Sequence, residues 1–351
     1  MSGSRHHLLF VAFIVIGTVG EKLSQIENEQ MHQICATYKK KNAMQDKILN
    51  GEKIESSEAP WAVAVLVFSA GGIMHCSGTL VSSRHVITAR HCFVVNSGKK
   101  GYTYVHNDDG IDYSNCDEND YVVPPKMIDA EVHFATRCRS EEVCKEINSS
   151  PSIVTRKVSA LFLPYLCTLK GPNEYFDQDD IAIIELAKDV LFSEKIHPIC
   201  VAESMTGVRQ GDNVTIYGFG FDPADDQIPS GILKYEKSYI AICSFVSEKY
   251  VCALSFTGRQ LACRGDSGGG VVFEAQNGVI TLVAIVSRGE ACRSDSKFGG
   301  DILTPIFMYM REICIYSGIC NMETAKNRLN TDGDGEREEA KVRKCLQKWL
   351  I

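Results

Sequence analysis

The chain has 351 residues, 44% of them hydrophobic and 23% charged, which is enough apolar sequence to bury a full core. Its formal net charge of -7 argues against a nucleic-acid partner, because proteins that bind nucleic acid present basic surfaces. The 15 cysteines exceed what a cytosolic enzyme usually carries and indicate an oxidising compartment.

Residues 1–20 have the pattern of a secretory signal peptide. Arg5 precedes an apolar run from Leu8 to Ile16, and Gly20 is a small residue at a suitable cleavage position. Because the run is short for a membrane span, we expect cleavage, a secreted extracellular protein and no stable membrane anchor. A signal anchor that stays in the membrane is the alternative.

After a polar segment, residues 21–47, the chain reads as the start of a β-barrel. Residues 62–68 are a continuous apolar run of strand type, and a Gly-Gly turn follows at 71–72. Further strands are expected at 76–81 and 85–88.

Residues 93–175 form an unusual insert. The stretch from Gly98 to Tyr121 is acidic and turn-rich, and a solvated loop is the favoured interpretation. A calcium loop is the alternative, because carboxylates suit that ion, but the spacing matches no known motif. We therefore expect no metal and no other cofactor. Asn148 and Asn213 begin Asn-X-Ser/Thr acceptors for glycosylation.

The segment Cys263-Arg264-Gly265-Asp266-Ser267-Gly268-Gly269-Gly270 is typical of a nucleophile loop. A serine hydroxyl attacks only when a nearby base removes its proton, and the attack creates an oxyanion that needs aligned donors. Glycines on both sides of Ser267 allow the tight bend, and Gly265 and Ser267 would supply the donor N–H groups. A glycine-rich surface turn is the alternative.

Three segments in a fixed order resemble the chymotrypsin/trypsin family of serine endopeptidases. They are Ile87-Thr88-Ala89-Arg90-His91-Cys92, Asp180-Ile181-Ala182-Ile183 and Gly265-Asp266-Ser267-Gly268-Gly269. The resemblance implies an all-β fold of two six-stranded antiparallel β-barrels with a C-terminal helix. It also implies a triad in which Ser267 attacks, His91 moves the proton and Asp180 orients His91, while Asp179 lies at the surface.

Lys47 and the following Ile48-Leu49-Asn50-Gly51 resemble the activation junction of that family. The resemblance implies a zymogen with an activation peptide at 21–47, which an activating protease cuts after Lys47. The freed amino group of Ile48 would then pair with Asp266, because an unpaired buried carboxylate is costly.

The resemblance also implies a set of disulfides. Cys35–Cys200 would tether the activation peptide, and the other three bridges would be Cys76–Cys92, Cys243–Cys252 and Cys263–Cys292. Seven cysteines remain, an odd number, so one is free or pairs with another chain. These are Cys116, Cys138, Cys144, Cys167, Cys314, Cys320 and Cys345.

By the same resemblance, Leu261 lies at the base of the primary substrate pocket, where an Asp would select Lys or Arg. Ser287, Arg288 and Gly289 resemble the segment that pairs with the substrate backbone, with Arg288 in place of a Trp. Leu261 and Gly289 favour an apolar or aromatic residue before the cut. Asp301 is the alternative determinant, if its register points it into the pocket.

Residues 318–351 form a C-terminal tail in which a short amphipathic helix is expected. The protease domain would span residues 48–317. Two functions remain, a secreted endopeptidase and a catalytically silent secreted binding protein on the same fold. The complete triad favours the endopeptidase, with protein or peptide substrates and room for a protein inhibitor.

Overall fold

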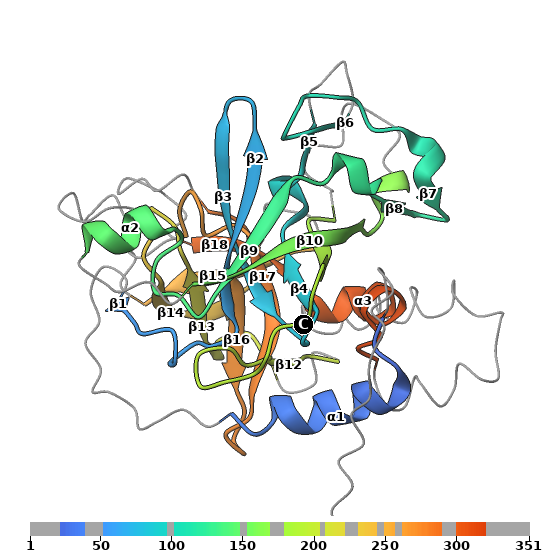
Figure 1. Cartoon of the computed structure of the whole chain (residues 1–351). Helices are drawn as coiled ribbons and strands as arrows, with labels where there is room; N and C mark the ends of the chain where they lie inside the picture. The colour runs from blue at the N-terminus through green and yellow to red at the C-terminus, as the bar shows by residue number, and fades with distance from the viewer. Residues whose placement is uncertain are drawn as a thin grey trace, which may run out of the picture.

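The computed structural model describes residues 22–38, 52–96, 102–147, 153–168, 179–203, 208–221, 231–243, 249–256, 262–289 and 300–320. In these residues the protein is mostly β, and its strands form two barrels with helices at the periphery (Figure 1). The predicted two-barrel fold with a C-terminal helix is confirmed. The signal peptide, the activation junction and the tail beyond residue 320 lie outside the described residues.

The first barrel contains β2 (Ala62–Ser69), β3 (Gly72–Leu80), β4 (His85–Thr88), β9 (Ala130–Phe134), β10 (Val154–Leu163) and β11 (Ala182–Leu186). Around the ring the order is β11, β4, β3, β2, β9, β10, and the antiparallel pairing of β10 with β11 closes it. Closure leaves none of these six strands at a free sheet edge. Two short strands, β7 (Cys116–Asp117) and β8 (Asp120–Val122), extend the sheet beside β10.

The second barrel contains β13 (Asn213–Gly218), β14 (Lys234–Ala241), β15 (Val251–Ser255), β16 (Gly270–Glu274), β17 (Ile280–Gly289) and β18 (Gly300–Pro305). Its order is β14, β13, β16, β17, β18, β15, and β15 pairs with β14 to close the ring. Two short strands join it from outside: β1 (Glu52–Lys53) pairs with β14, and β12 (Cys200–Val201) pairs with β17 in parallel.

The apolar run predicted at 62–68 forms β2, and its first six residues are buried on both faces. A strand that is covered on both sides reads as a continuous apolar run, which explains why this stretch lacks alternation. Trp61, directly before β2, is 1% exposed and meets the ring of Tyr217 on β13 edge to face at 5.7 Å. This contact joins the two barrels.

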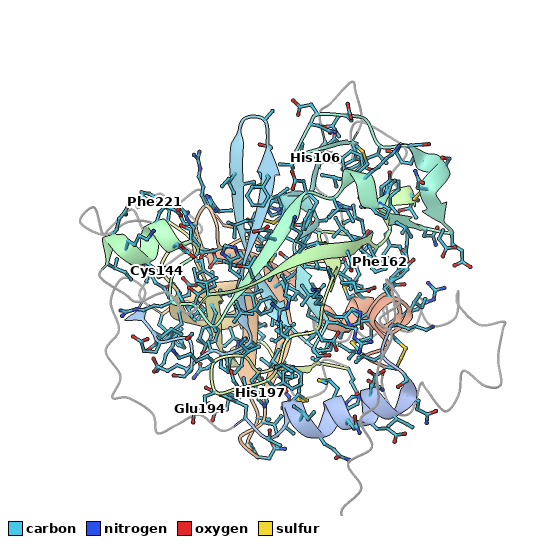
Figure 2. All side chains as sticks on the ribbon, viewed as in Figure 1. His106, Cys144, Phe162, Glu194, His197 and Phe221 are labelled. Atoms are coloured by element: carbon cyan, nitrogen blue, oxygen red, sulfur yellow. A yellow bond between two sulfur atoms is a disulfide. The ribbon has the colours of Figure 1, made fainter. Side chains whose placement is uncertain are left out.

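Helices cover the outside of the barrels. The α-helices are α1 (Gln25–Cys35), α2 (Glu141–Glu146) and α3 (Met310–Ser317), and the short 3-10 helices are η1 (Arg90–Cys92), η3 (Tyr113–Asn115), η4 (Pro125–Met127), η5 (Leu166–Thr168) and η6 (Ile306–Tyr309). α3 packs on the first barrel, where Tyr316 stacks on Phe162 of β10 with ring centres 4.4 Å apart. Phe162 is labelled in Figure 2.

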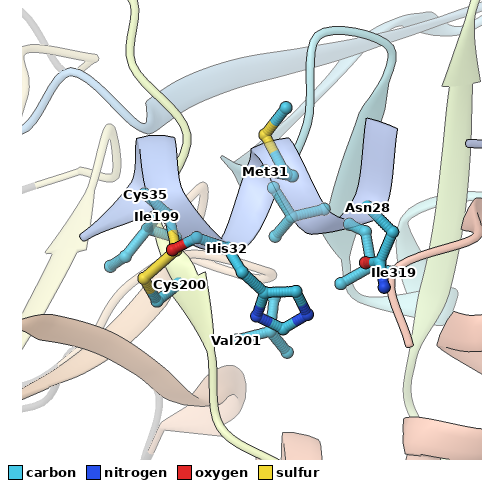
Figure 3. Close-up of a pocket in the computed structure, with 9 residues that line it drawn as sticks. Asn28, Met31, His32, Cys35, Ile199, Cys200, Val201 and Ile319 are labelled. Atoms are coloured by element: carbon cyan, nitrogen blue, oxygen red, sulfur yellow. A yellow bond between two sulfur atoms is a disulfide. The ribbon is translucent and has the colours of Figure 1, made fainter. Parts of the chain in front are cut away.

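The segment before the expected activation junction is docked on the body of the protein. α1 begins at Ser24, whose side chain forms a capping box with Glu27. The Asn28 side chain exchanges hydrogen bonds with the backbone of Cys320, at 3.0 Å and 3.1 Å. Beneath α1, Met31, His32 and their neighbours line a pocket of about 10 Å³, large enough for at most about one water molecule (Figure 3).

The stretch from Gly98 to Tyr121, expected as a solvated loop, is only partly one where the structure describes it. Its acidic turns at 107–119 are mostly exposed, whereas its two ends are buried. The hairpin of β5 (Val94–Asn96) and β6 (Tyr102–Tyr104) buries Tyr102 and Tyr104, and β8 buries Tyr121. The Tyr104 and Tyr121 hydroxyls are 2.6 Å apart. These aromatic residues are separated by acidic ones in the sequence, so their common packing arises only in the folded chain.

Candidate active site

The barrels bring together three side chains that are far apart in the sequence. Thr88 at the end of β4 pairs with Ala182 at the start of β11, so the residues that continue from these two ends are neighbours. His91 follows on η1 after β4, and Asp180 directly precedes β11. Ser267 lies in the turn before β16 of the second barrel, and its carbonyl accepts a hydrogen bond from the Ser77 N–H of β3 at 2.8 Å.

A continuous hydrogen-bonded chain joins these three side chains. Ser267 Oγ lies 2.8 Å from His91 Nε2, and His91 Nδ1 lies 2.9 Å from Asp180 Oδ2. The His91 backbone N–H also donates to Asp180 Oδ1 at 3.0 Å. The imidazole is therefore fixed in position and orientation, with Nε2 directed at the serine hydroxyl.

The electrostatics of this chain follow from burial and from the two opposite charges. Burial raises the pKa of Asp180, whereas His91 and the hydrogen bond from Ser287 lower it. The lowering effects together are larger, so the pKa of Asp180 lies below its usual range. Burial lowers the pKa of His91, whereas Asp180 raises it above the usual value of histidine. The charges of Arg90 and Arg288 act in the opposite direction on the His91 pKa.

The backbone around Ser267 is bent into a donor pocket. Gly265 has φ of 102°, a conformation that favours glycine. Within the described residues, neither the Gly265 N–H nor the Ser267 N–H donates a hydrogen bond. These two N–H groups lie beside the Ser267 hydroxyl, where they could donate hydrogen bonds to an oxyanion formed by attack of that hydroxyl.

Ser77 is a site residue that the sequence analysis missed. It is 1% exposed, and its hydroxyl donates to the Gly265 carbonyl at 2.8 Å and accepts from the Phe219 N–H at 2.9 Å. It thus ties the bend at Gly265 to both barrels. No local motif marks Ser77, because its partners come from segments more than 140 residues away.

Asp266 is held by backbone donors. Its Oδ1 accepts from the Gly220 N–H at 2.7 Å, and its Oδ2 accepts from the Cys263 N–H at 2.9 Å. Its predicted partner, Ile48, lies outside the described residues, as does Lys47.

The expected substrate-binding segment forms the last part of β17. Arg288 and Gly289 pair with Ile302 and Asp301 of β18, and Ser287 lies at the register shift between Val286 and Arg288. Ser287 donates from Oγ to Asp180 Oδ2 at 2.6 Å, and the Arg288 guanidinium lies 5.1 Å from the centre of the Tyr250 ring.

The register of β17 and β18 decides the position of Asp301. Gly289 pairs with Asp301, and the Asp301 side chain is buried beside Gly289. The Asp301 side chain therefore points towards Gly289 and Ala262. Leu261, the other expected determinant, lies outside the described residues.

The expectation that Asp179 lies at the surface is wrong. Asp179 is 3% exposed, pairs with Lys249 Nζ at 2.8 Å and accepts from the Tyr309 hydroxyl at 2.8 Å. The cation is Lys249 of the second barrel and the hydrogen-bond donor is Tyr309 of η6. Asp179 is therefore a buried carboxylate whose charge is balanced by partners. Asp179 and Asp180 therefore have separate partners.

Disulfides fix the surroundings of the site. The structure contains three of the four bridges that the resemblance implies, Cys35–Cys200, Cys76–Cys92 and Cys243–Cys252. Cys263 is also disulfide-bonded, and its expected partner Cys292 lies outside the described residues, as does Cys345. Six of the cysteines left open pair as Cys116–Cys167, Cys138–Cys144 and Cys314–Cys320.

Comparisons with known proteins agree with this geometry. A family model described as the Nematode trypsin-6-like family matches residues 5–320. The chain is 25% identical over 309 residues to Transmembrane protease serine 11B of Homo sapiens, covering 85% of this chain and 62% of that protein. It is 29% identical over 264 residues to CLIP domain-containing serine protease B15 of Anopheles gambiae, covering 70% and 62%.

A third relative, the Proclotting enzyme of Tachypleus tridentatus, is 28% identical over 276 residues, covering 74% of this chain and 63% of that protein. The chain thus spans about three fifths of the length of these curated relatives. None of the helices among the described residues is both long and apolar enough to cross a membrane.

Proposed function

Because the chain belongs to the nematode trypsin-6-like family, whose curated relatives are trypsin-like serine proteases, we propose that it is a secreted serine endopeptidase. The observation that carries the proposal is the hydrogen-bonded chain from Ser267 through His91 to Asp180. In the proposed reaction His91 takes the proton of Ser267 as its oxygen attacks the substrate carbonyl. His91 then returns that proton to the leaving amine.

The remaining site residues have supporting roles in this proposal. The Gly265 and Ser267 N–H groups bind the oxyanion, and Asp180 holds His91 in the tautomer with the proton on Nδ1. The edge of β17 at residues 287–289 pairs with the substrate backbone. No step requires a cofactor. The disulfides support a secreted location, since such bonds persist in oxidising compartments.

A fluorophosphonate probe tests the proposal on the processed protein. Labelling that disappears in Ser267→Ala is expected, because the reagent reacts with an activated serine hydroxyl. Absence of labelling in fully processed wild type would instead favour a catalytically silent binding protein.

Activation by cleavage after Lys47 is part of the proposal. Four residues beyond Ile48, Glu52 pairs with Tyr235 of β14, and four residues span at most about 14 Å. β14 pairs with β13, whose Gly218 packs against the Asp266 carboxyl group, and this arrangement supports the proposed pairing of the Ile48 amino group with Asp266.

We expect Lys47→Gln to be secreted but inactive, whereas Lys41→Gln, a basic residue of the same segment, is processed normally. N-terminal sequencing of the active species should begin at Ile48. On a non-reducing gel the fragment should remain attached through Cys35–Cys200, and reduction should release it. An active species with another N-terminus contradicts this activation step.

Ser77 is proposed as a positioning residue for the oxyanion site. Ser77→Ala leaves the Gly265 carbonyl and the Phe219 N–H without a partner, so the bend at Gly265 loosens. We expect kcat to fall about 10- to 100-fold with little change in KM, because the lost alignment matters mainly in the transition state.

Ser317→Ala is the matched control for Ser77. Ser317 is equally buried, donates to the Ile313 carbonyl and accepts from the Ile319 N–H, but it lies at the end of α3. Both variants should lose similar stability, and only Ser77→Ala should lose kcat. Equal kcat in the two variants would show that Ser77 does not position the oxyanion site.

A further inference from the structure

The outer face of the second barrel carries an apolar patch. β14 lies between β13 and β15, and Tyr239 of β14 pairs directly with Leu254 of β15 (Figure 1). Ser238 and Ser255 are buried, so Tyr239, Leu254 and Phe256 face outwards, because successive side chains of a strand alternate. Phe256 is 50% exposed, and the centres of the Tyr239 and Phe256 rings are 5.4 Å apart. We call these three residues the aromatic patch, and exposed apolar patches usually mark a surface that something covers.

Asn213, the first residue of β13, lies beside the aromatic patch. It pairs directly with Tyr239, which places their Cβ atoms about 5 Å apart on the same face of the sheet. Asn213 is exposed, and none of the described residues forms a hydrogen bond with its side chain. The sequence Asn213-Val214-Thr215 is an acceptor for N-linked glycosylation. A bulky glycan can therefore be attached at Asn213 without displacing any of the described residues.

The two aromatic rings suit the first sugars of such a glycan. A pyranose ring presents a face of C–H bonds, whose hydrogens carry a partial positive charge, and an aromatic ring presents a negative face. N-acetylglucosamine adds an apolar methyl group in its acetamido substituent. A sugar linked to Asn213 would meet the Tyr239 ring first and the neighbouring Phe256 ring next. Its packing there would remove apolar surface from water, which is favourable.

We propose that Asn213 carries an N-linked glycan whose first N-acetylglucosamine units pack on Tyr239 and Phe256. The proposal rests on the secretory route of the proposed function, because the glycan donor, an oligosaccharide linked to a lipid pyrophosphate, is met on that route. The Asn213 amide nitrogen forms a bond to C1 of the first sugar, and the bond from C1 to the pyrophosphate oxygen breaks. The nitrogen gives up one proton and the lipid pyrophosphate leaves, so nothing is oxidised or reduced.

The proposed glycan lies away from the triad. β13 runs about 17 Å from Asn213 to Gly218, and it is Gly218 at the far end that packs against the Asp266 carboxyl group. The glycan should therefore act on stability and self-association and not on the reaction. We expect labelling by the fluorophosphonate probe to be the same in wild type and in Asn213→Gln.

Intact-mass measurement of the full chain, secreted from a eukaryotic host, tests whether Asn213 is occupied. Asn213→Gln keeps an amide but is no acceptor, and Thr215→Ala removes the hydroxyl that the acceptor sequence needs, whereas Thr215→Ser keeps it. We expect Asn213→Gln and Thr215→Ala each to lack one glycan that wild type and Thr215→Ser carry. A wild-type protein without a glycan at Asn213 overturns the proposal.

A double-mutant cycle tests whether the sugar packs on the aromatic patch. Asn213→Gln should lower the unfolding temperature by about 2 to 4 °C. Tyr239→Ser should lower it more in the glycosylated protein than in the Asn213→Gln background, because only the glycosylated protein has a sugar contact to lose. Tyr113→Ser is the matched control, a tyrosine of the insert that is 44% exposed, and its effect should be equal in both backgrounds. Equal effects of Tyr239→Ser in both backgrounds refute the packing.

Enzymatic trimming makes the same comparison on one folded wild-type protein, so the test does not depend on how the variants fold. An endoglycosidase that leaves only the first sugar should preserve most of the stabilisation, because that sugar is the one beside Tyr239. Complete removal by a peptide N-glycosidase should lower the unfolding temperature to that of Asn213→Gln. An unfolding temperature that complete removal leaves unchanged contradicts the proposal.

The alternative occupant of the aromatic patch is a second copy of the chain. A glycan over the patch keeps copies apart, so we expect glycosylated wild type to be monomeric by light scattering. A dimer that Phe256→Ser dissociates would overturn the proposal and assign the patch to a contact between copies.

The outcomes separate this proposal from the proposed function. A glycan whose stabilisation depends on Tyr239, in a protein that the fluorophosphonate probe does not label, supports the glycan site and refutes the endopeptidase. Labelling of a secreted wild type that carries no glycan at Asn213 supports the endopeptidase and refutes the glycan site.

Discussion

Ser267→Ala is expected to lower kcat by about 10⁴- to 10⁶-fold, the largest loss of any single substitution in this protein. The hydroxyl oxygen, 2.8 Å from His91 Nε2, forms the bond to the substrate in the proposed reaction, and alanine has no atom to replace it. The backbone N–H groups of residues 265 and 267 remain, so substrate affinity should change little.

His91→Ala should be nearly as damaging, and the double variant should be little worse than either single variant. This non-additivity is expected because the two side chains act as one unit, and without the base the hydroxyl is inert. Turnover of a chromogenic ester and of a peptide should be measured after complete processing. Ser159→Ala, a hydroxyl on β10 that donates to the Glu185 carbonyl, is the control and should retain wild-type turnover. Equal activity in wild type and Ser267→Ala would refute the proposed endopeptidase function.

Asp180→Asn is expected to lower kcat about 10⁴-fold. The carboxylate accepts hydrogen bonds from the His91 ring, the His91 backbone and Ser287, and all three hold the imidazole. An amide placed there can donate to Nδ1, which favours the tautomer with the proton on Nε2. That tautomer cannot accept the serine proton.

The same substitution should shift the pH profile. Burial lowers the His91 pKa and Asp180 raises it, so loss of the Asp180 charge lowers it. Because neutral His91 is the active form, kcat/KM rises with pH through this pKa, and the acid limb should move to lower pH in Asp180→Asn. Profiles from about pH 5 to about pH 9 would show the shift. An unchanged acid limb means that another group controls it.

Asp179→Asn is the matched control for Asp180→Asn. Asp179 is the adjacent buried carboxylate, but its partners are Lys249 and Tyr309 rather than His91. Its replacement breaks a buried ion pair and should lower the unfolding temperature while leaving the acid limb in place. If Asp179→Asn instead has the larger effect on kcat, the two carboxylates have been assigned the wrong way round.

Much of the site could be predicted from the sequence because each part has a strong local sequence motif. The nucleophile loop needs glycines at fixed offsets from Ser267, and the segments around His91 and Asp180 lie next to apolar strands. The apolar run 62–68 likewise predicted β2 from local sequence. A strand that is buried on both faces has apolar residues at every position. Cysteine spacing with the resemblance likewise indicated Cys76–Cys92 beside His91.

Residues whose roles depend on distant partners could not be predicted. Ser77 is an ordinary strand serine until the folded chain sets its hydroxyl between Gly265 and Phe219. Glu236 looks like a polar residue of an alternating strand. Its burial beside Asp301 follows from ring closure, in which β14 pairs with β15 and β15 with β18.

The sequence by itself determined the family, the two-barrel fold and the order His91, Asp180, Ser267, because these depend on local motifs and strand patterns. Only the tertiary structure decided which way Asp301 points, how Asp179 is buried and which cysteines of the insert pair. The physical reason is that a one-residue change of strand register turns a side chain to the opposite face. No residue type or spacing within one strand records that register, which is set by the neighbouring strands across the barrel.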